Sequence, residues 1–172
     1  MTEPDDKPRE SRIEISRQAL NFSVGHFTIL SATKRENLHG HNFQLVCEFA
    51  APLGKDGLMF DYGMLKDVLR GLCDEIDEQM ILPGNSPYLS IEKQDSYTIA
   101  IFNDERIPFL ERDVTILPIA NVTVEELSHY FLDKLLLHPH LKDRGISEIT
   151  IKIGSSPGQF GVATWPKTGS RT

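Results

Sequence analysis

The amino-acid sequence predicts a single domain of the α+β class, with strands at both ends of the chain and two helices between them. Three observations support this prediction: segments rich in β-branched and aromatic residues, two stretches with apolar residues at helical spacing, and a 40% apolar composition over 172 residues. A chain of this size and composition can bury a substantial core. The expected elements are strands at 12–28 and 39–51, helices at 61–78 and 123–137, and strands at 147–153 and 160–165.

The first two strands are expected to pair with each other. Residues 42–50 read Asn-Phe-Gln-Leu-Val-Cys-Glu-Phe-Ala, a composition that suits a strand beginning at or just before His39. Residues 11–24 also look extended, so they could pair antiparallel with this strand across the intervening loop. Because side chains alternate along a strand, His39 and His41 should point to the same side, with Gly40 turned to the other.

Two stretches have the apolar periodicity of amphipathic helices. In residues 61–78 the apolar positions are Leu65, Val68, Leu69, Leu72 and Ile76. In residues 123–137 the stripe is Leu127, Tyr130, Phe131, Lys134 and Leu135, and His138-Pro139 follows as a stop signal. Asp61 is placed to cap the first helix, and Thr123 to cap the second with Glu126 as its capping-box partner.

The segment between the two helices, residues 88–117, contains a hairpin. Residues 97–102 are strand-like, Asn103-Asp104 is typical of a turn, and strand-like residues resume at Arg106. The tip of this hairpin is polar, which is the usual character of a solvent-exposed turn.

The most informative chemical feature is a set of three histidines, His26, His39 and His41. His39 and His41 are about 7 Å apart along one strand by its usual rise, so they can share one metal if a neighbouring strand supplies a third ligand. His26 is the obvious third ligand, because its strand should pair with the strand that begins near His39. Three neutral imidazoles and an open fourth position are the coordination of catalytic zinc, although other divalent ions tolerate such a site.

Charge and composition exclude several classes of partner. A net charge of -7 and a pI near 5.3 argue against nucleic acid or an anionic membrane. The longest apolar runs are too short to span a bilayer. Residues 1–11 are polar and are expected to form a disordered tail, which leaves residues 12–172 as one domain. Two cysteines, Cys47 and Cys73, are too few for a disulfide framework, which favours a cytoplasmic location.

Five motifs occur in the order and spacing of a known family. They are Phe22-Ser23-Val24-Gly25-His26, His39-Gly40-His41-Asn42-Phe43, Gly57-Leu58-Met59-Phe60-Asp61-Tyr62, Asn121-Val122-Thr123-Val124-Glu125-Glu126-Leu127 and Ile151-Lys152-Ile153-Gly154-Ser155-Ser156-Pro157-Gly158. Their order and spacing, over residues 12–165, resemble the 6-pyruvoyltetrahydropterin synthase and 6-carboxytetrahydropterin synthase family. The resemblance implies a tunnelling-fold subunit, an antiparallel β-sheet with two helices packed on one face. It also implies a homo-oligomer, a trimer or hexamer with sites at subunit interfaces, in which the hairpin near 88–117 is an insertion.

The positions that this family uses for catalysis differ in this chain. The loop at 32–38 lacks the family's cysteine base and contains Glu36 in a Glu-x-x-His-Gly-His run, which resembles paralogues that cleave the dihydroneopterin side chain. A carboxylate there could serve as the base, with its pKa raised by partial burial. Asp77 matches one member of the family's Asp-His pair, whereas Glu78 replaces the histidine. Ser155 stands where a family glutamate clamps the pterin through two hydrogen bonds. Cys73 could replace the missing thiol, but a buried structural role is the simpler expectation.

The resemblance therefore implies a zinc-dependent lyase acting on 7,8-dihydroneopterin triphosphate or a related dihydropterin. In that scheme the metal ligands are His26, His39 and His41, the catalytic set is Glu36, Asp77 and Glu78, and the substrate contacts are Ser155, Thr123 and Glu125. The alternative is a non-catalytic metal-binding tunnelling-fold protein that binds another heterocycle or a protein partner. Ser155 and Glu78 favour this alternative, whereas the Glu-x-x-His-Gly-His run favours the enzyme.

Overall fold

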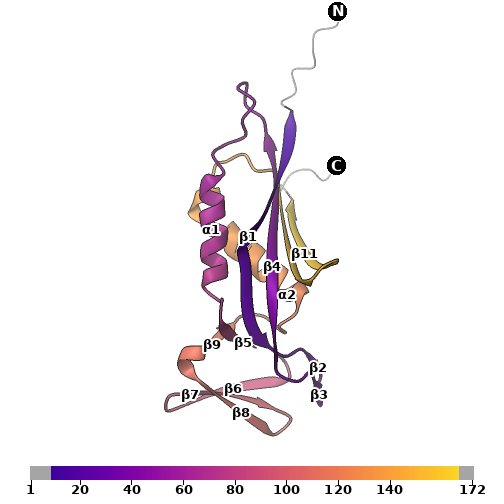
Figure 1. The fold of residues 1–172 in the computed structure, drawn as a ribbon, viewed down its shortest axis with the longest axis vertical. Helices are drawn as coiled ribbons and strands as arrows, with labels where there is room; N and C mark the ends of the chain where they lie inside the picture. The colour runs from indigo at the N-terminus through magenta and orange to yellow at the C-terminus, as the bar shows by residue number, and fades with distance from the viewer. Residues whose placement is uncertain (1–8, 167–172) are drawn as a thin grey trace, which may run out of the picture.

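A computed structural model describes residues 9–166, which form a six-stranded sheet, two smaller sheets and two α-helices (Figure 1). The six-stranded sheet has the order β11-β10-β4-β1-β5-β9. Its strands are β1 (Glu10–His26), β4 (His39–Pro52), β5 (Gln79–Pro83), β9 (Val114–Leu117), β10 (Glu148–Ser156) and β11 (Gln159–Pro166). The helices are α1 (Gly63–Asp74) and α2 (Val124–Leu136), and two 3-10 turns are η1 (Glu111–Asp113) and η2 (Pro139–Leu141).

Strands β1 and β4 pair antiparallel over most of their length, as the sequence predicts. The register places His26 opposite His39, Gly25 opposite Gly40 and Val24 opposite His41. Because residues two apart share a face, the face that buries Phe22 and Val24 continues to His26 at the end of β1. The strand begins at Glu10, so the last part of the expected tail at 1–11 is strand, and residues 1–8 lie outside the described residues.

The main sheet is mixed, which differs from the antiparallel sheet that the sequence predicts. Strand β5 pairs parallel with β1, and β9 pairs parallel with β5. Strand β5 reads Gln-Met-Ile-Leu-Pro, and four of its five residues are buried. A strand buried on both faces has no apolar-polar alternation, which is why the sequence pattern does not reveal it.

Both helices are shorter than expected. Helix α1 ends at Asp74, and residues 75–78 form a turn in which Glu75 keeps a right-handed backbone and Glu78 has a left-handed one with φ of 57°. At its start Tyr62 is the N-cap, and the Asp61 carboxylate accepts a hydrogen bond from the Gly63 N–H at 2.9 Å.

The predicted cap of α2 is confirmed, because the Thr123 hydroxyl accepts a hydrogen bond from the Glu126 N–H at 3.3 Å. The second half of the capping box is not formed. The Glu126 carboxylate accepts a hydrogen bond from the Ala120 N–H at 2.9 Å and so ties the preceding loop to the helix.

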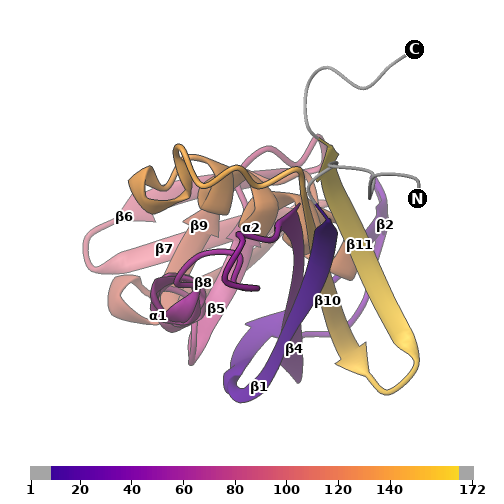
Figure 2. The same ribbon diagram turned by 90° about the horizontal axis from the view of Figure 1, so that it is seen from above.

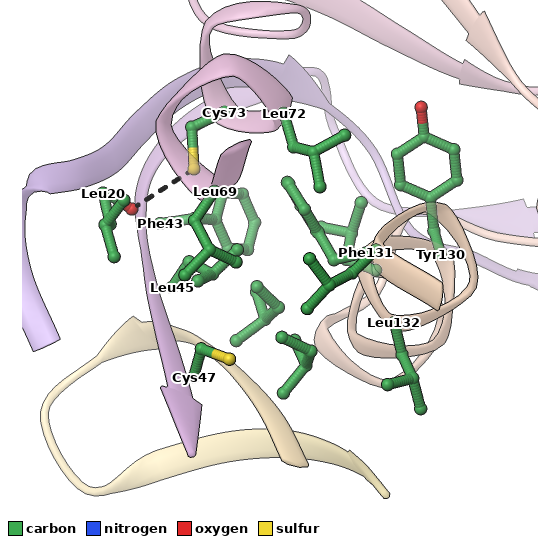
Figure 3. Close-up of a cluster of buried hydrophobic side chains, with 14 of the residues drawn as sticks. Leu20, Phe43, Leu45, Cys47, Leu69, Leu72, Cys73, Tyr130, Phe131 and Leu132 are labelled. Carbon is green, nitrogen blue, oxygen red and sulfur yellow. Dashed lines mark hydrogen bonds between the residues drawn. The ribbon is translucent and has the colours of Figure 1, made fainter. Parts of the chain in front are cut away.

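The helices cover one side of β1, β4, β10 and β11 (Figure 2), and the main core lies between them and the sheet. Figure 3 shows how Leu69 and Cys73 of α1 and Phe131 of α2 meet Phe43 and Leu45 of β4. Burial raises the pKa of Cys47 and of Cys73 to about 12 in each case, so both thiols stay protonated at neutral pH. Cys73 donates a weak hydrogen bond to the Leu20 carbonyl, 3.6 Å away. A nucleophilic role for Cys73 is therefore not supported.

The expected hairpin is present and belongs to a three-stranded sheet. Strands β7 (Tyr97–Phe102) and β8 (Glu105–Leu110) are joined by Asn103-Asp104, and β6 (Leu89–Gln94) pairs with β7 as a third strand. This sheet packs on a second apolar cluster formed by Phe27, Ile29, Met80, Leu82, Leu89, Ala100 and Phe102. In Figure 1 it lies at the end of the main sheet where β1 finishes and β4 begins, beside the short β2 (Ile29–Ser31) and β3 (Lys34–Arg35).

Within residues 9–166 the longest helix has 13 residues, and none has the length and apolar character needed to cross a membrane.

Candidate metal centre and adjoining pocket

Three histidine side chains meet where β1 ends and β4 begins. The ligand atoms of His26, His39 and His41 all lie within 4.8 Å of one another. The ring centroids are 4.6 Å apart for His26 and His39, 5.3 Å for His26 and His41, and 4.8 Å for His39 and His41. Two imidazoles come from alternate positions of β4 and the third from the paired strand, so the β1–β4 register assembles the cluster.

Backbone carbonyls orient two of these rings. His26 Nδ1 lies 3.1 Å from the Val122 carbonyl oxygen, and His39 Nδ1 lies 2.8 Å from the Asn37 carbonyl oxygen. A carbonyl can only accept, so each Nδ1 carries the hydrogen and each Nε2 keeps a free lone pair. This is the arrangement in which metal-binding histidines are usually held.

The donor set fits a metal ion. His26 is 5% exposed, and its Nε2 is buried with no hydrogen-bond partner among residues 9–166. Burial lowers the pKa of His26, and the nearby His39 ring lowers it further, so the neutral ligand form is favoured. A buried unpaired nitrogen is costly unless something binds it, and a divalent ion shared with His39 and His41 would do so.

Glu36 follows β3 and lies beside this cluster. Its Oε2 atom is 4.0 Å from His39 Nε2 and accepts a hydrogen bond from the Thr28 N–H at 3.1 Å. Hydrogen bonds from the side chain and the backbone of Thr28 lower the pKa of Glu36 and outweigh the opposing effect of burial. The expectation that burial raises this pKa is therefore wrong, since the side chain is 45% exposed. The group is a carboxylate at neutral pH.

Asp77 and Glu78 lie in the turn between α1 and β5, not at the end of a helix as expected. The Asp77 carboxylate accepts a hydrogen bond from the Ser23 N–H at 2.7 Å, and the Glu78 N–H donates to the Ser23 carbonyl at 2.7 Å. These two bonds attach the turn to β1 and set the start of β5 beside it. The left-handed backbone of Glu78 is unusual for a residue other than glycine, and such outliers concentrate at functional sites.

A pocket of about 660 Å³ adjoins the cluster and contains three of the predicted residues: His41, Glu78 and Ser155. Asn42, Asp113 and Met80 also line it, with backbone and side chains of neighbouring β1, β4 and β5 residues. Its volume suits a small heterocyclic ligand. The charged groups in its lining are the carboxylates of Glu78 and Asp113, so the pocket favours a ligand that presents hydrogen-bond donors.

Thr123 and Glu125, the other two predicted substrate contacts, do not line this pocket. Thr123 caps α2, and Glu125 is exposed in the first turn of the helix. Two further groups orient the histidines, the carbonyls of Val122 and Asn37, and neither was predicted because a main-chain acceptor has no sequence signature. A detectable signal was Asn121, whose side chain holds the Val122 loop against β2.

Comparison with known proteins agrees with this architecture. Residues 14–162 match the family model described as 6-pyruvoyl tetrahydropterin synthase. The chain is 28% identical over 144 residues to a protein of Methanocaldococcus jannaschii provisionally named 6-carboxy-5,6,7,8-tetrahydropterin synthase, covering 81% of this chain and 86% of that protein.

Solved structures of this family superpose on the fold. The 6-pyruvoyl tetrahydropterin synthase of Plasmodium vivax matches with a TM-score of 0.86 and 26% identity, over 92% of this chain and 99% of that chain. The corresponding enzyme of Plasmodium falciparum matches with a TM-score of 0.85 and 28% identity, over 91% and 98% of the two chains. The tunnelling-fold prediction is confirmed, and the chain belongs to the 6-pyruvoyl tetrahydropterin synthase family.

Proposed function

We propose that this protein is a zinc-dependent lyase acting on 7,8-dihydroneopterin triphosphate or a related dihydropterin. The observation that carries the proposal is the convergence of three imidazoles, two of them oriented by backbone carbonyls, with an ionised carboxylate, Glu36, placed 4.0 Å from His39 Nε2. Family membership supports the same reading, since the relatives are named as tetrahydropterin synthases.

Zinc held by His26, His39 and His41 would supply Lewis acidity that lowers the pKa of hydroxyl groups on the substrate side chain. Glu36 then accepts the proton from a hydroxyl or C–H group of that side chain, because it is ionised and reaches the same space as His39. A solved variant of the Plasmodium vivax enzyme, 25% identical to this chain, is described as a catalytic residue mutant in which a glutamate is replaced by alanine. This description supports a catalytic role for a glutamate in that enzyme, and we propose such a role for Glu36.

The pocket supplies the remaining roles in the proposal. Glu78 lines it together with His41, so its carboxylate can exchange a proton with a ligand bound there, and Asp77 holds the Glu78 turn on β1. Ser155 offers a hydroxyl to the heterocycle. Thr123 and Glu125 do not line this pocket, and we propose that any substrate contact they make is at a subunit interface. We propose a trimer or hexamer in which strands β9 and β11, the edges of the main sheet, are covered by pairing.

The competing proposal is a non-catalytic metal-binding protein that takes another heterocycle or a protein partner. It is favoured by Ser155, because one hydroxyl cannot form the two ionic hydrogen bonds of the family's glutamate clamp. In either case we expect a cytoplasmic protein, since Cys47 and Cys73 are buried free thiols.

The test is incubation of purified, metal-analysed protein with dihydroneopterin triphosphate and with dihydroneopterin, followed by mass spectrometry of the products. Conversion that is lost on chelation and in His39→Ala supports the lyase. Glu36→Gln should abolish turnover and leave the zinc content unchanged, whereas Glu92→Gln, an exposed carboxylate of β6, should change neither. Stoichiometric zinc without conversion of either compound would favour the binding protein.

A further inference from the structure

Arg35 joins the loop that carries Glu36 to the three-stranded sheet of β6, β7 and β8, which the family resemblance predicts to be an insertion and which is called the inserted sheet below. This arginine ends β3, and its side chain is only 19% exposed. Its guanidinium lies over two aromatic rings, 5.1 Å from the centroid of Phe27 and 5.8 Å from that of Phe102. Phe27 precedes β2, and Phe102 ends β7 of the inserted sheet, so the guanidinium joins the two.

The guanidinium also donates hydrogen bonds in two directions. Nη2 donates to the Glu105 carboxylate at 2.9 Å, and Nη1 donates to the Glu36 carbonyl at 2.9 Å. A guanidinium is planar and rigid, so fixing one nitrogen against Glu105 and the plane against the rings determines where Nη1 points. The main-chain carbonyl of Glu36 is therefore held at a position that the inserted sheet sets.

The turn between β7 and β8 builds the surface that receives Arg35. Asn103 and Asp104 have φ values of 46° and 66°, the left-handed pair of a two-residue type I′ turn. This turn places Phe102 directly opposite Glu105 in the strand register. The ring and the carboxylate that Arg35 contacts are thus a cross-strand pair whose geometry a tight turn fixes.

The remaining contacts of Glu36 complete its support. Its N–H donates to the Thr28 carbonyl at 2.9 Å, and its Oε2 accepts from the Thr28 N–H at 3.1 Å. Thr28 thus holds the amide and the carboxylate, and Arg35 holds the carbonyl. Without the hydrogen bond from Arg35, the main-chain carbonyl of Glu36 would no longer be held. The carboxylate of the same residue lies 4.0 Å from His39 Nε2.

We propose that Arg35 is a positioning residue, through which the inserted sheet holds the carboxylate of Glu36 at the metal centre. The inference rests on the proposed function for its effect on turnover, but the effect on the loop at 32–38 does not depend on it. A displacement of about 1 Å at a reacting group can lower a rate about 100-fold, so support of this kind matters to catalysis.

The first measurement is steady-state kinetics of the zinc-loaded protein with dihydroneopterin triphosphate. Arg35→Lys keeps the charge and loses the planar fork, and Arg35→Gln loses both. We expect kcat to fall about 10-fold in the first and about 100-fold in the second, with KM within about twofold of the wild type and zinc content unchanged. Arg106→Gln is the matched control, because Arg106 forms a 3.0 Å ion pair with Glu92 in the same inserted sheet. It should leave kcat unchanged.

The second measurement is hydrogen–deuterium exchange of the peptide covering residues 32–38, which needs no substrate. Exchange of this peptide should rise in Arg35→Gln and stay unchanged in Arg106→Gln. If exchange rises in Arg35→Gln but the wild-type protein converts neither pterin, the positioning role stands and the lyase is rejected. Unchanged exchange, or an active enzyme whose Arg35 variants keep full kcat or change only KM, would overturn the positioning role.

Discussion

Replacing Asn121 by alanine should weaken both the fold and metal binding, because one amide holds the loop that orients His26. The Asn121 side chain accepts hydrogen bonds from the Ile29 N–H and the Val122 N–H at 3.0 Å each, and it donates to the Ile29 carbonyl at 2.7 Å. Val122 in turn offers its carbonyl to His26 Nδ1 at 3.1 Å. The amide therefore joins β2 to the loop before α2 and presents the acceptor that fixes the His26 ring.

The magnitude follows from three partly buried hydrogen bonds. At about 0.5–1.5 kcal/mol for each bond, Asn121→Ala should lower the free energy of unfolding of the metal-free protein by about 2–4 kcal/mol. For a domain of this size each kcal/mol corresponds to about 2–4 °C in Tm, so Tm should fall by roughly 5–15 °C. Loss of a group that orients a metal ligand typically weakens metal binding about 10- to 100-fold.

The assay combines urea denaturation of the metal-free protein with zinc affinity measured by competition against a chromophoric chelator. Asn85→Ala is the control, because its side chain donates a single hydrogen bond to the Pro118 carbonyl at 2.9 Å, and we expect a cost of about 1 kcal/mol and no change in zinc affinity. If Asn121→Ala retained both the stability and the zinc affinity of the wild type, the Asn121 amide would not be what holds the Val122 carbonyl against His26.

Three further predictions concern the core and its charges. Gly161→Ala should destabilise the folded protein by several kcal/mol, since an added Cβ would lie 2.2 Å from the Val124 carbonyl oxygen. Gly71 has open space around it, so Gly71→Ala should stabilise α1 by about 0.5–1 kcal/mol. Thermal unfolding of the two variants and the wild type tests both expectations. Both cysteines should resist a thiol reagent at pH 8 until denaturant is added, because burial raises their pKa to about 12; one equivalent reacting in the native protein would contradict this. The Lys152 ammonium lowers the pKa of Glu48 in the folded protein. The stability from this pair should therefore be present above pH 4.5, the ordinary pKa, and be lost as the pH falls through the lower folded pKa. Glu48→Gln should make the urea midpoint depend less on pH between about pH 6 and 3.

The features that sequence reasoning reached are those with a local pattern. The β-branched and aromatic composition of residues 42–50 predicted β4, and the alternation of side chains along a strand predicted the shared side of His39 and His41. The Thr123-x-x-Glu126 spacing predicted the N-cap of α2. The Asn103-Asp104 pair likewise indicated a turn, and its backbone conformation is the one that asparagine and aspartate adopt more readily than most residues. In each case neighbours within a few positions determine the structure.

The features that it missed depend on contacts distant in the chain. Strands β5 and β9 join the sheet through parallel pairing with strands that are distant in the chain. Strand β5 is also buried on both faces, so its sequence has no alternation of apolar and polar residues. The turn after α1 places Glu78 in a left-handed backbone, a conformation for which glycine is the expected residue. The lowered pKa of Glu36 comes from Thr28, eight residues earlier, through a loop geometry that composition does not specify.

The glutamate at position 36 changes what the rest of the site must provide. Its pKa is held below the ordinary value by Thr28, so at neutral pH it is always available to accept a proton, but its intrinsic basicity is modest. A weaker base depends more on a short, well-aligned approach to the proton and on an acidified substrate hydroxyl. The contacts around Glu36 address the first need, because Thr28 and Arg35 hold its amide, carboxylate and carbonyl separately. A metal ion held by His26, His39 and His41, as proposed, would address the second. Under the proposed function, the three-stranded sheet packed against this loop would serve catalysis by holding Glu36 in place through Arg35, because a carboxylate base depends on such positioning.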